Sequence, residues 1–148
     1  MAEAAAKQGD RIVSDGTSQV WVEPPPPPPP PANHIAVPFS YDGSLDSGLV
    51  SDVKIMGQPA AVVGSTAINE TPPDQQPAVT GKGRVLSDVD NTSTISVGSS
   101  SVLIHGKSAA RNGDKAKTWD YSLPSSPGEG REVENADVRA SGSVIIGN

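Results

Sequence analysis

Few residues in this 148-residue chain could carry chemistry, because it has no cysteine and two histidines. Gly106-Lys107-Ser108 matches the end of a phosphate-binding loop, but such a loop needs a glycine five residues earlier, where Ser101 stands. No Gly-x-Ser-x-Gly elbow accompanies a histidine base, and the carboxylates are scattered over Gly/Pro-rich turns rather than paired. We therefore expect that the protein is not an enzyme.

The two histidines, His34 and His105, are the only candidate metal ligands of imidazole type. Two imidazoles would need an aspartate or water to complete the tetrahedral site that zinc prefers. The competing interpretation is that His34 fills a loop and His105 occupies the end of a strand. The sequence therefore predicts no cofactor, with His34 and His105 as weak candidates for zinc.

Charge and hydropathy exclude several classes of partner. The formal net charge is −6 and the largest basic cluster is Lys115-Ala116-Lys117, which excludes a nucleic-acid footprint. No run of 18 apolar residues could cross a membrane as a helix, and residues 1–11 lack a signal-peptide core. We expect synthesis in the cytoplasm, no cleaved signal, and no further domain fused on either side.

Composition favours an all-β fold with little helix. Glycine and proline contribute 15 residues each, and short apolar runs lie between these turn formers. The expected strands are residues 35–39, 50–56, 60–63, 94–97, 102–104 and 143–146. Residues 3–7 have helical propensity but are too few for a stable helix. Residues 1–148 are expected to form a single domain, with mobile loops at 70–83 and 122–130.

A run of eight prolines at residues 24–31 is the most visible landmark. It should adopt polyproline II and span roughly 25 Å at about 3.1 Å per residue. Three interpretations are open: a segment packed along its own domain, a stiff spacer, or a ligand for a foreign groove.

One phrase occurs three times in the chain. Residues 53–65 and 102–114 share Val, Ile, Gly, Ala, Ala and Gly at equivalent positions. The third copy is split, with residues 5–10 supplying its second half and residues 144–147 its first. A repeat divided between the ends closes only if the termini are adjacent, so that no free strand edge remains. We predict a pseudo-threefold β domain with adjacent termini.

Each copy ends in a turn, marked by Gly9 and Asp10, by Gly64, and by Gly113 and Asp114. Glycine permits positive φ, and aspartate can accept a backbone N–H hydrogen bond within the turn. Lys7 and Arg111 carry matching positive charges, whereas the middle copy has Val62 and Ser65 instead of the charged pair. An ion pair and two independent solvated charges are both compatible with this pattern.

Gly-Lys-Ser-Ala-Ala-Arg-x-Gly-Asp at residues 106–114 resembles the proline-alanine-alanine-arginine (PAAR) repeat, with Ser108 in place of the proline. The middle copy keeps that proline in residues 58–61, and residues 37–41 resemble the PAAR-like branch of the family. The resemblance implies a conical, roughly threefold β domain. Family members often bind zinc near the apex through histidines and a cysteine after the Gly-Asp turns, but here neither turn is followed by such residues.

The resemblance also implies a place in a contractile injection system. It predicts a spike-tip protein that caps a trimeric VgrG-type spike, one chain per trimer, and pierces a target membrane. Effector cargo would be a separate partner. The candidate contact residues are apolar strand positions of the three copies, namely Val53, Ile55, Val102, Ile104, Val144 and Ile146, which could equally face the core. The alternative is a polyproline-bearing, adhesin-like baseplate component that caps no spike.

Overall fold

Strands dominate the computed structural model, which describes residues 2–14, 18–25, 34–86, 88–122 and 129–148. The strands are β1 (Glu3–Ala4), β2 (Arg11–Ser14), β3 (Ser18–Glu23), β4 (Ile35–Phe39), β5 (Asp42–Ser47), β6 (Val50–Ile55), β7 (Gln58–Ala60), β8 (Thr66–Ile68), β9 (Arg84–Val85), β10 (Thr92–Ile95), β11 (Leu103–Ile104), β12 (Lys107–Ser108), β13 (Lys115–Asp120), β14 (Arg131–Arg139) and β15 (Ile145–Ile146). The helices are the 3-10 turn η1 (Pro73–Gln75) and α1 (Pro77–Thr80). The fold is all-β, as predicted.

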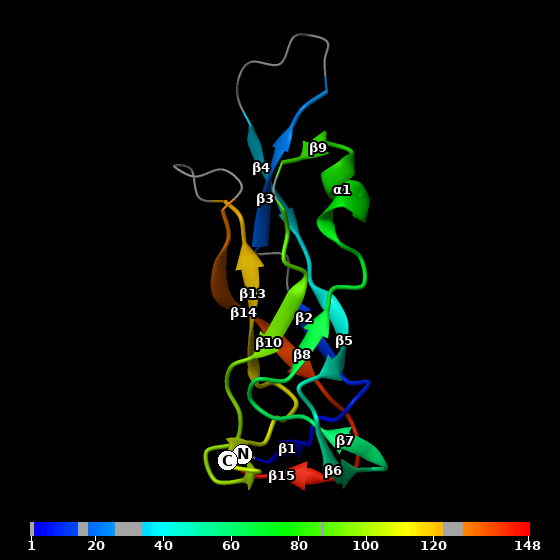
Figure 1. The fold of residues 1–148 in the computed structure, drawn as a ribbon, viewed down its shortest axis with the longest axis vertical. Helices are drawn as coiled ribbons and strands as arrows, with labels where there is room; N and C mark the ends of the chain where they lie inside the picture. The colour runs from blue at the N-terminus through cyan, green and yellow to red at the C-terminus, as the bar shows by residue number, and fades with distance from the viewer. Residues whose placement is uncertain (1, 15–17, 26–33, 87, 123–128) are drawn as a thin grey trace.

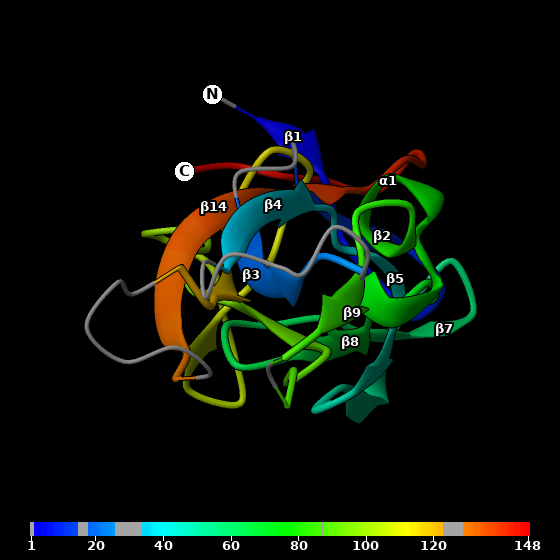
Figure 2. The ribbon, with the colours of Figure 1, turned by 90° about the horizontal axis from the view of Figure 1, so that it is seen from above.

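A closed antiparallel barrel forms the middle of the molecule, with strand order β10-β13-β14-β2-β5-β8. Figure 1 shows the β1–β15 and β6–β7 pairs below this barrel, and β3, β4, β9 and α1 above it. Viewed along the long axis in Figure 2, the barrel strands surround a common centre. Closure pairs every barrel strand on both edges, which removes the open edges that invite aggregation.

We call the end of the molecule below the barrel in Figure 1 the wide end, and its strand pairs basal, and we call the opposite end, with β3 and β4, the narrow end. The two ends of the chain lie side by side at the wide end (Figure 1). Glu3 pairs with Ile146 and Ala4 with Ile145, and the Ala5 N–H donates to the Val144 carbonyl at 2.8 Å. The adjacency of the termini is therefore confirmed. Residues 3–4 form a strand rather than a helix, because a pairing partner satisfies backbone groups that one isolated helical turn would leave open.

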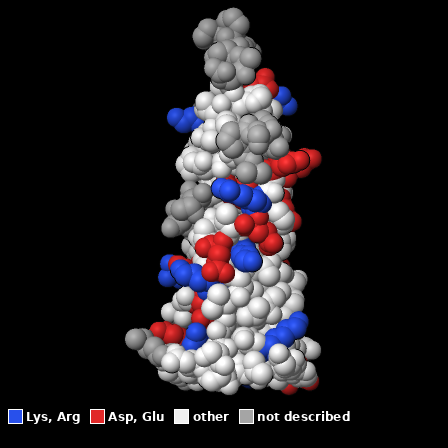
Figure 3. Space-filling view, turned by 90° about the vertical axis from the view of Figure 1, so that its left-hand side faces the viewer, with Lys and Arg blue, Asp and Glu red and all other residues white. Residues whose placement is uncertain are grey.

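The narrow end has its own apolar core. Val20 and Val22 of β3 pack with Phe39, Tyr41 and other buried side chains. Burial raises the pKa of the Tyr41 hydroxyl, which donates to the Asp90 carbonyl. The described atoms taper from a broad base toward this end in Figure 3.

One segment expected as a mobile loop contains two short helices at the narrow end, and two other segments expected as linker or loop fall mostly outside the described residues. Residues 70–83, expected as a mobile loop, instead contain η1 and α1, whose Pro73 and Val79 are buried. Proline at the first helical position fixes φ and loses no hydrogen bond there, which explains both short helices. Most of the 24–31 proline run lies outside the described residues, as does much of the 122–130 loop. The three interpretations of the proline run stay predictions.

Candidate functional site

The second halves of the three copies meet at the boundary between the barrel and the wide end. The Ala6 N–H donates to the Ala110 carbonyl at 2.9 Å, Ala110 donates to Ala61 at 3.0 Å, and Ala61 donates to Ala6 at 3.0 Å. All three alanines are fully buried. The copies thus form a closed cycle of backbone hydrogen bonds, while threefold symmetry of the whole domain stays a prediction.

Each copy then turns into the barrel through its glycine. The φ angles of Gly9, Gly64 and Gly113 are 92°, 98° and 86°. Their N–H groups donate, in the same order, to the carbonyls of Leu45, Ile95 and Val138, which lie on β5, β10 and β14. A side chain with a Cβ is strained at such angles, so the glycines let each turn attach to one barrel strand.

Asp10 and Asp114 both form ion pairs within their turns. Asp114 accepts hydrogen bonds from the Arg111 backbone N–H at 2.7 Å and from its guanidinium Nη2 at 2.8 Å. Lys7 Nζ lies 3.1 Å from Asp10 Oδ2. The hydrogen bond to Asp114 raises the pKa of Arg111. The open choice between ion pairs and solvated charges is thus decided in favour of ion pairs.

The middle copy has no such ion pair, and the side chains of its turn are fully buried. Val62 and Ser65 are 1% and 0% exposed. Ser65 Oγ accepts the Val62 N–H at 3.0 Å, as Asp114 does for Arg111, and donates to the Gly48 carbonyl at 2.8 Å. Burying a charge pair there would cost more desolvation than its attraction returns, whereas a hydroxyl is satisfied by the backbone.

Replacing Asp114 with alanine is expected to lower the free energy of unfolding by about 2–3 kcal/mol, because it leaves the half-buried Arg111 cation unpaired. The double variant Arg111→Val/Asp114→Ser copies the middle turn and should lose less than the single variant. Urea titration of both proteins measures the difference. A loss under about 0.5 kcal/mol for Asp114→Ala would mean that the Arg111–Asp114 ion pair contributes no more to stability than a solvent-exposed pair does.

The first halves of the copies, together with the first alanine of each second half, form an apolar cluster beyond the cycle. Ala5, Ala60 and Ala109 are buried in it, whereas the next residue of each copy, the alanine that takes part in the hydrogen-bond cycle, belongs to the barrel core. Of the six candidate contact residues, Ile55 and Ile146 are buried in this cluster, Val53, Val102 and Ile104 pack against it, and Val144 is 40% exposed. The cluster is separate from the barrel core and lies at the wide end.

The opposite face of the same strands is more exposed. Leu103 and Ile145, which alternate with the cluster residues, are 62% and 56% exposed. Met56 is 55% exposed at a hairpin tip. Sequence reasoning did not single out these three residues, although the Val-x-Ile alternation marks the intervening positions as outward-facing.

Charged side chains gather on the flank of the barrel, whereas the wide end is mostly uncharged on the face in Figure 3. Arg11 of β2 pairs with Asp42 of β5 at 2.6 Å and with Glu70 at 3.0 Å. The Arg11 hydrogen bond lowers the pKa of Glu70. These pairs are solvent-exposed, so each contributes little to stability.

Two of the three basal strand pairs are closed by tight turns with positive φ at both central residues. The φ values are 50° and 82° for Met56 and Gly57, and 51° and 78° for His105 and Gly106. This is the type I′ geometry that suits two-residue hairpins. The third pair, β15 with β1, is also antiparallel, and Ile146 pairs with Glu3 where a hairpin would have its turn. The two chain ends leave the pair at that point instead of being joined by a turn.

Joining Ile146 to Glu3 through an Asn-Gly dipeptide should therefore build the missing type I′ turn. Such backbone closure restricts the unfolded chain, and we expect the free energy of unfolding to rise by about 2–4 kcal/mol. Thermal and urea unfolding of the circular protein, beside a linear chain ending in the same dipeptide, provide the measurement. An unchanged midpoint would show that the seam is not hairpin-like in solution.

The structure separates the two histidines. His105 lies in the basal β11–β12 turn, with Nε2 2.9 Å from Asp52 Oδ1 on β6. His34 lies beside Trp21, and the centroids of the two rings are 6.4 Å apart. Trp21 belongs to β3, which lies in the upper half of Figure 1. No three His, Cys, Asp or Glu side chains of the described segments converge as a metal site. The described donors therefore do not fit the zinc site that the family resemblance implied.

The structure and the comparisons together define the class of protein. The helices of the described segments are too short or too polar to span a bilayer. No curated protein sequence and no solved structure matches the chain. The family model described as the PAAR motif matches residues 43–118, more than half of the chain and including both continuous copies. The protein belongs to the PAAR motif family, whose motif is associated with spike-tip proteins of contractile injection systems.

Proposed function

We propose that the wide end caps the blunt end of a trimeric β-helical spike of the VgrG type, with one chain per trimer. The observation that carries this proposal is the closed hydrogen-bond cycle of Ala6, Ala61 and Ala110 above one apolar cluster. A single chain that presents three related sectors around an axis can meet three identical subunits with similar contacts.

The contact surface that we propose is the cluster face of the basal strands. Val53, Val102 and Val144 occupy equivalent positions in the three copies and retain partial or substantial exposure. Ile55, Ile104 and Ile146 lie next to them, nearer the cluster interior. An apolar surface of this kind gains free energy when a partner removes it from water.

The narrow end would then lead when the machine contracts. In this proposal the role is mechanical rather than catalytic: the cap sharpens the spike, touches the target membrane transiently, and leaves the cytoplasm with the particle. Effector cargo would join as a separate partner. The tapered shape in Figure 3 supports this orientation, because it sets the broad end against the spike.

Co-expression with the C-terminal β-helix of the cognate trimeric spike tests the proposal. Light scattering after size exclusion should give the mass of one chain bound to three spike subunits. A mass with three caps per trimer, or no complex at micromolar concentration, would contradict it. The second outcome would favour the adhesin-like baseplate component that carries a proline run and caps no spike.

A further inference from the structure

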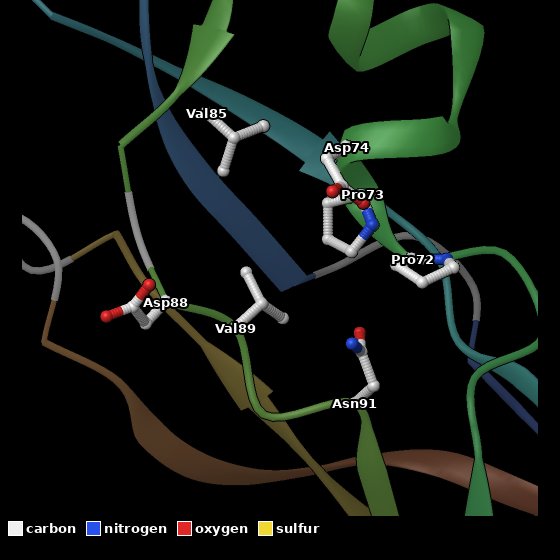
Figure 4. Close-up of a pocket in the computed structure, with 7 residues that line it drawn as sticks. All are labelled: Pro72, Pro73, Asp74, Val85, Asp88, Val89 and Asn91. Carbon is white, nitrogen blue, oxygen red and sulfur yellow. The ribbon is translucent and has the colours of Figure 1, made fainter.

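A hollow of about 210 Å³ lies at the narrow end, between η1 and residues 85–91 (Figure 4). Its carboxylates, Asp74 and Asp88, are exposed, and the amide oxygen of Asn91 is buried out of reach of anything in the hollow. The charges around the hollow are thus shared with bulk water, and we assign no binding site to it.

A second closed cycle of contacts runs around the rim of the wide end. In each copy, the residue that follows the first strand contacts a residue at or before the first strand of another copy. These rim contacts join Ser143 Oγ to Met56 Sδ at 4.0 Å, His105 Nε2 to Asp52 Oδ1 at 2.9 Å, and Ser99 Oγ to the Gly147 carbonyl at 2.9 Å. Each rim contact therefore links two copies that lie far apart in the chain.

Two residues of this cycle have a backbone conformation that is unfavourable for their side chains. Met56 and His105 have φ values of 50° and 51°, in the left-handed region. Asparagine and glycine are the residues that usually occupy the first position of such turns. A bulky side chain at positive φ is an outlier that points to a role for that side chain. For both residues, the rim contact supplies such a role.

The Met56 contact helps to hold the segment that leads into β15. Residues 140–143 join β14 to β15 and belong to neither strand. Lys7 Nζ donates to the Ser141 carbonyl at 2.7 Å. Met56 Sδ packs directly on Gly142, where a Cβ would lie 2.5 Å from the sulfur. The position of this segment therefore depends on side chains that reach it from other turns.

Met56 carries the one sulfur atom of the described residues, because the sequence has no cysteine and its other methionine, Met1, lies outside them. Met56 is 55% exposed, so small oxidants can reach it. Hydrogen peroxide transfers one oxygen atom to a thioether: the S–O bond forms, the O–O bond breaks, the sulfur loses two electrons, and the peroxide is reduced to water. The product is a sulfoxide, which is polar where the thioether was apolar.

We propose that Met56 is a reversible oxidation site that controls how firmly residues 140–146 are attached to the wide end. The sulfur already lies against the Gly142 backbone, so a hydrated sulfoxide oxygen turns the side chain toward water and breaks the rim contact. β15 then separates from β1 more often. The other two rim contacts contain no sulfur and stay intact. Methionine sulfoxide reductases restore the thioether, which makes the change reversible.

The oxidation site adjoins the contact surface proposed above, because residues 140–143 lead directly into Val144. Oxidation of Met56 would therefore weaken capping, a consequence that rests on the proposed function. The modification itself needs no spike and is measured on the free chain. Failure of the capping proposal would thus leave the oxidation result unchanged, and the two proposals fail separately.

Hydrogen exchange of the isotope-labelled full chain, followed by amide NMR before and after mild treatment with hydrogen peroxide, tests the proposal. Peptide mass mapping should place one added oxygen on Met56 and distinguishes it from Met1. The Ala5 N–H, which donates to the Val144 carbonyl at 2.8 Å, should exchange about fivefold faster or more after oxidation. Treatment with a methionine sulfoxide reductase should return the native rate.

The matched control amide is that of Ala109, which donates to the Val102 carbonyl at 3.0 Å in a continuous copy and should keep its exchange rate. Met56→Leu keeps an apolar side chain without sulfur, so its Ala5 exchange should not respond to peroxide. Resistance of Met56 to peroxide, or a native Ala5 rate in the oxidised protein, would overturn the proposal. Equal acceleration of both amides, or a response in Met56→Leu, would also overturn it, because the effect would then not arise at this contact.

Discussion

Replacing Ala110 with leucine is expected to lower the free energy of unfolding by about 3 kcal/mol or more. Ala110 has no exposed surface, and its N–H and carbonyl join it to Ala61 and Ala6. Three backbones converge there, so a larger side chain can be placed only by separating strands that belong to different copies. Urea unfolding followed by circular dichroism provides the measurement.

Ala78→Leu is the matched control, because Ala78 is an exposed residue of α1. The same change in volume should alter stability there by less than about 0.5 kcal/mol. A similar small effect for Ala110→Leu would show that the axis is not tightly packed, and the cycle of alanines would lose its proposed structural role.

Changing Val102 and Val144 together to aspartate should weaken binding to the trimeric spike by about 100-fold or more, equivalent to ~2.8 kcal/mol. This result depends on the proposed capping function. Val102 packs against the apolar cluster and Val144 occupies the equivalent position just before β15, and both keep some exposure in the free protein. Capping would bury the introduced carboxylates in an apolar contact. Affinity is measured by calorimetry or by surface-immobilised spike.

Leu103→Asp/Ile145→Asp is the control on the opposite face of the same two strands, and we expect its affinity to stay within about fivefold of the native value. Because Val102 is partly buried, amide NMR spectra must first show that the Val102→Asp/Val144→Asp variant folds. If the double variant does not fold, Val144→Asp alone replaces it in the binding measurement. If only the Leu103/Ile145 variant loses affinity, the spike contacts the outward face. If neither does, the wide end is not the docking surface.

Strands with a continuous apolar run were recognised from the sequence. Residues 35–39 coincide with β4, and residues 50–56 contain β6 (Val50–Ile55). The expected strand 60–63 was mostly wrong, because β7 ends at Ala60 and, beyond it, Val62 forms an isolated bridge to Ala109 of another copy. Such a bridge joins two copies that lie far apart in the chain, and the local hydrophobic periodicity does not reveal this pairing.

Strands with small or polar inward positions were missed. β13 buries Ala116, Thr118 and Asp120 in strict alternation, and β14 contains one Ala and two Val among charged residues. Their inward side can be small because the barrel interior already holds larger side chains such as Ile12 and Leu45. Period-two alternation that included Ala and Thr would have identified β13.

The sequence by itself determined the all-β class, the threefold occurrence of the motif and the adjacency of the termini. These follow from the spacing of the repeats and from the residues typical of turns, both of which can be read along the chain without knowing its fold. Only the tertiary structure decided which charges pair, which strand face joins the basal cluster, and that His34 and His105 belong to opposite ends. It also revealed that Met56 contacts the segment before β15. Each of these depends on distances between segments far apart in the chain, and those distances are set by barrel closure and packing.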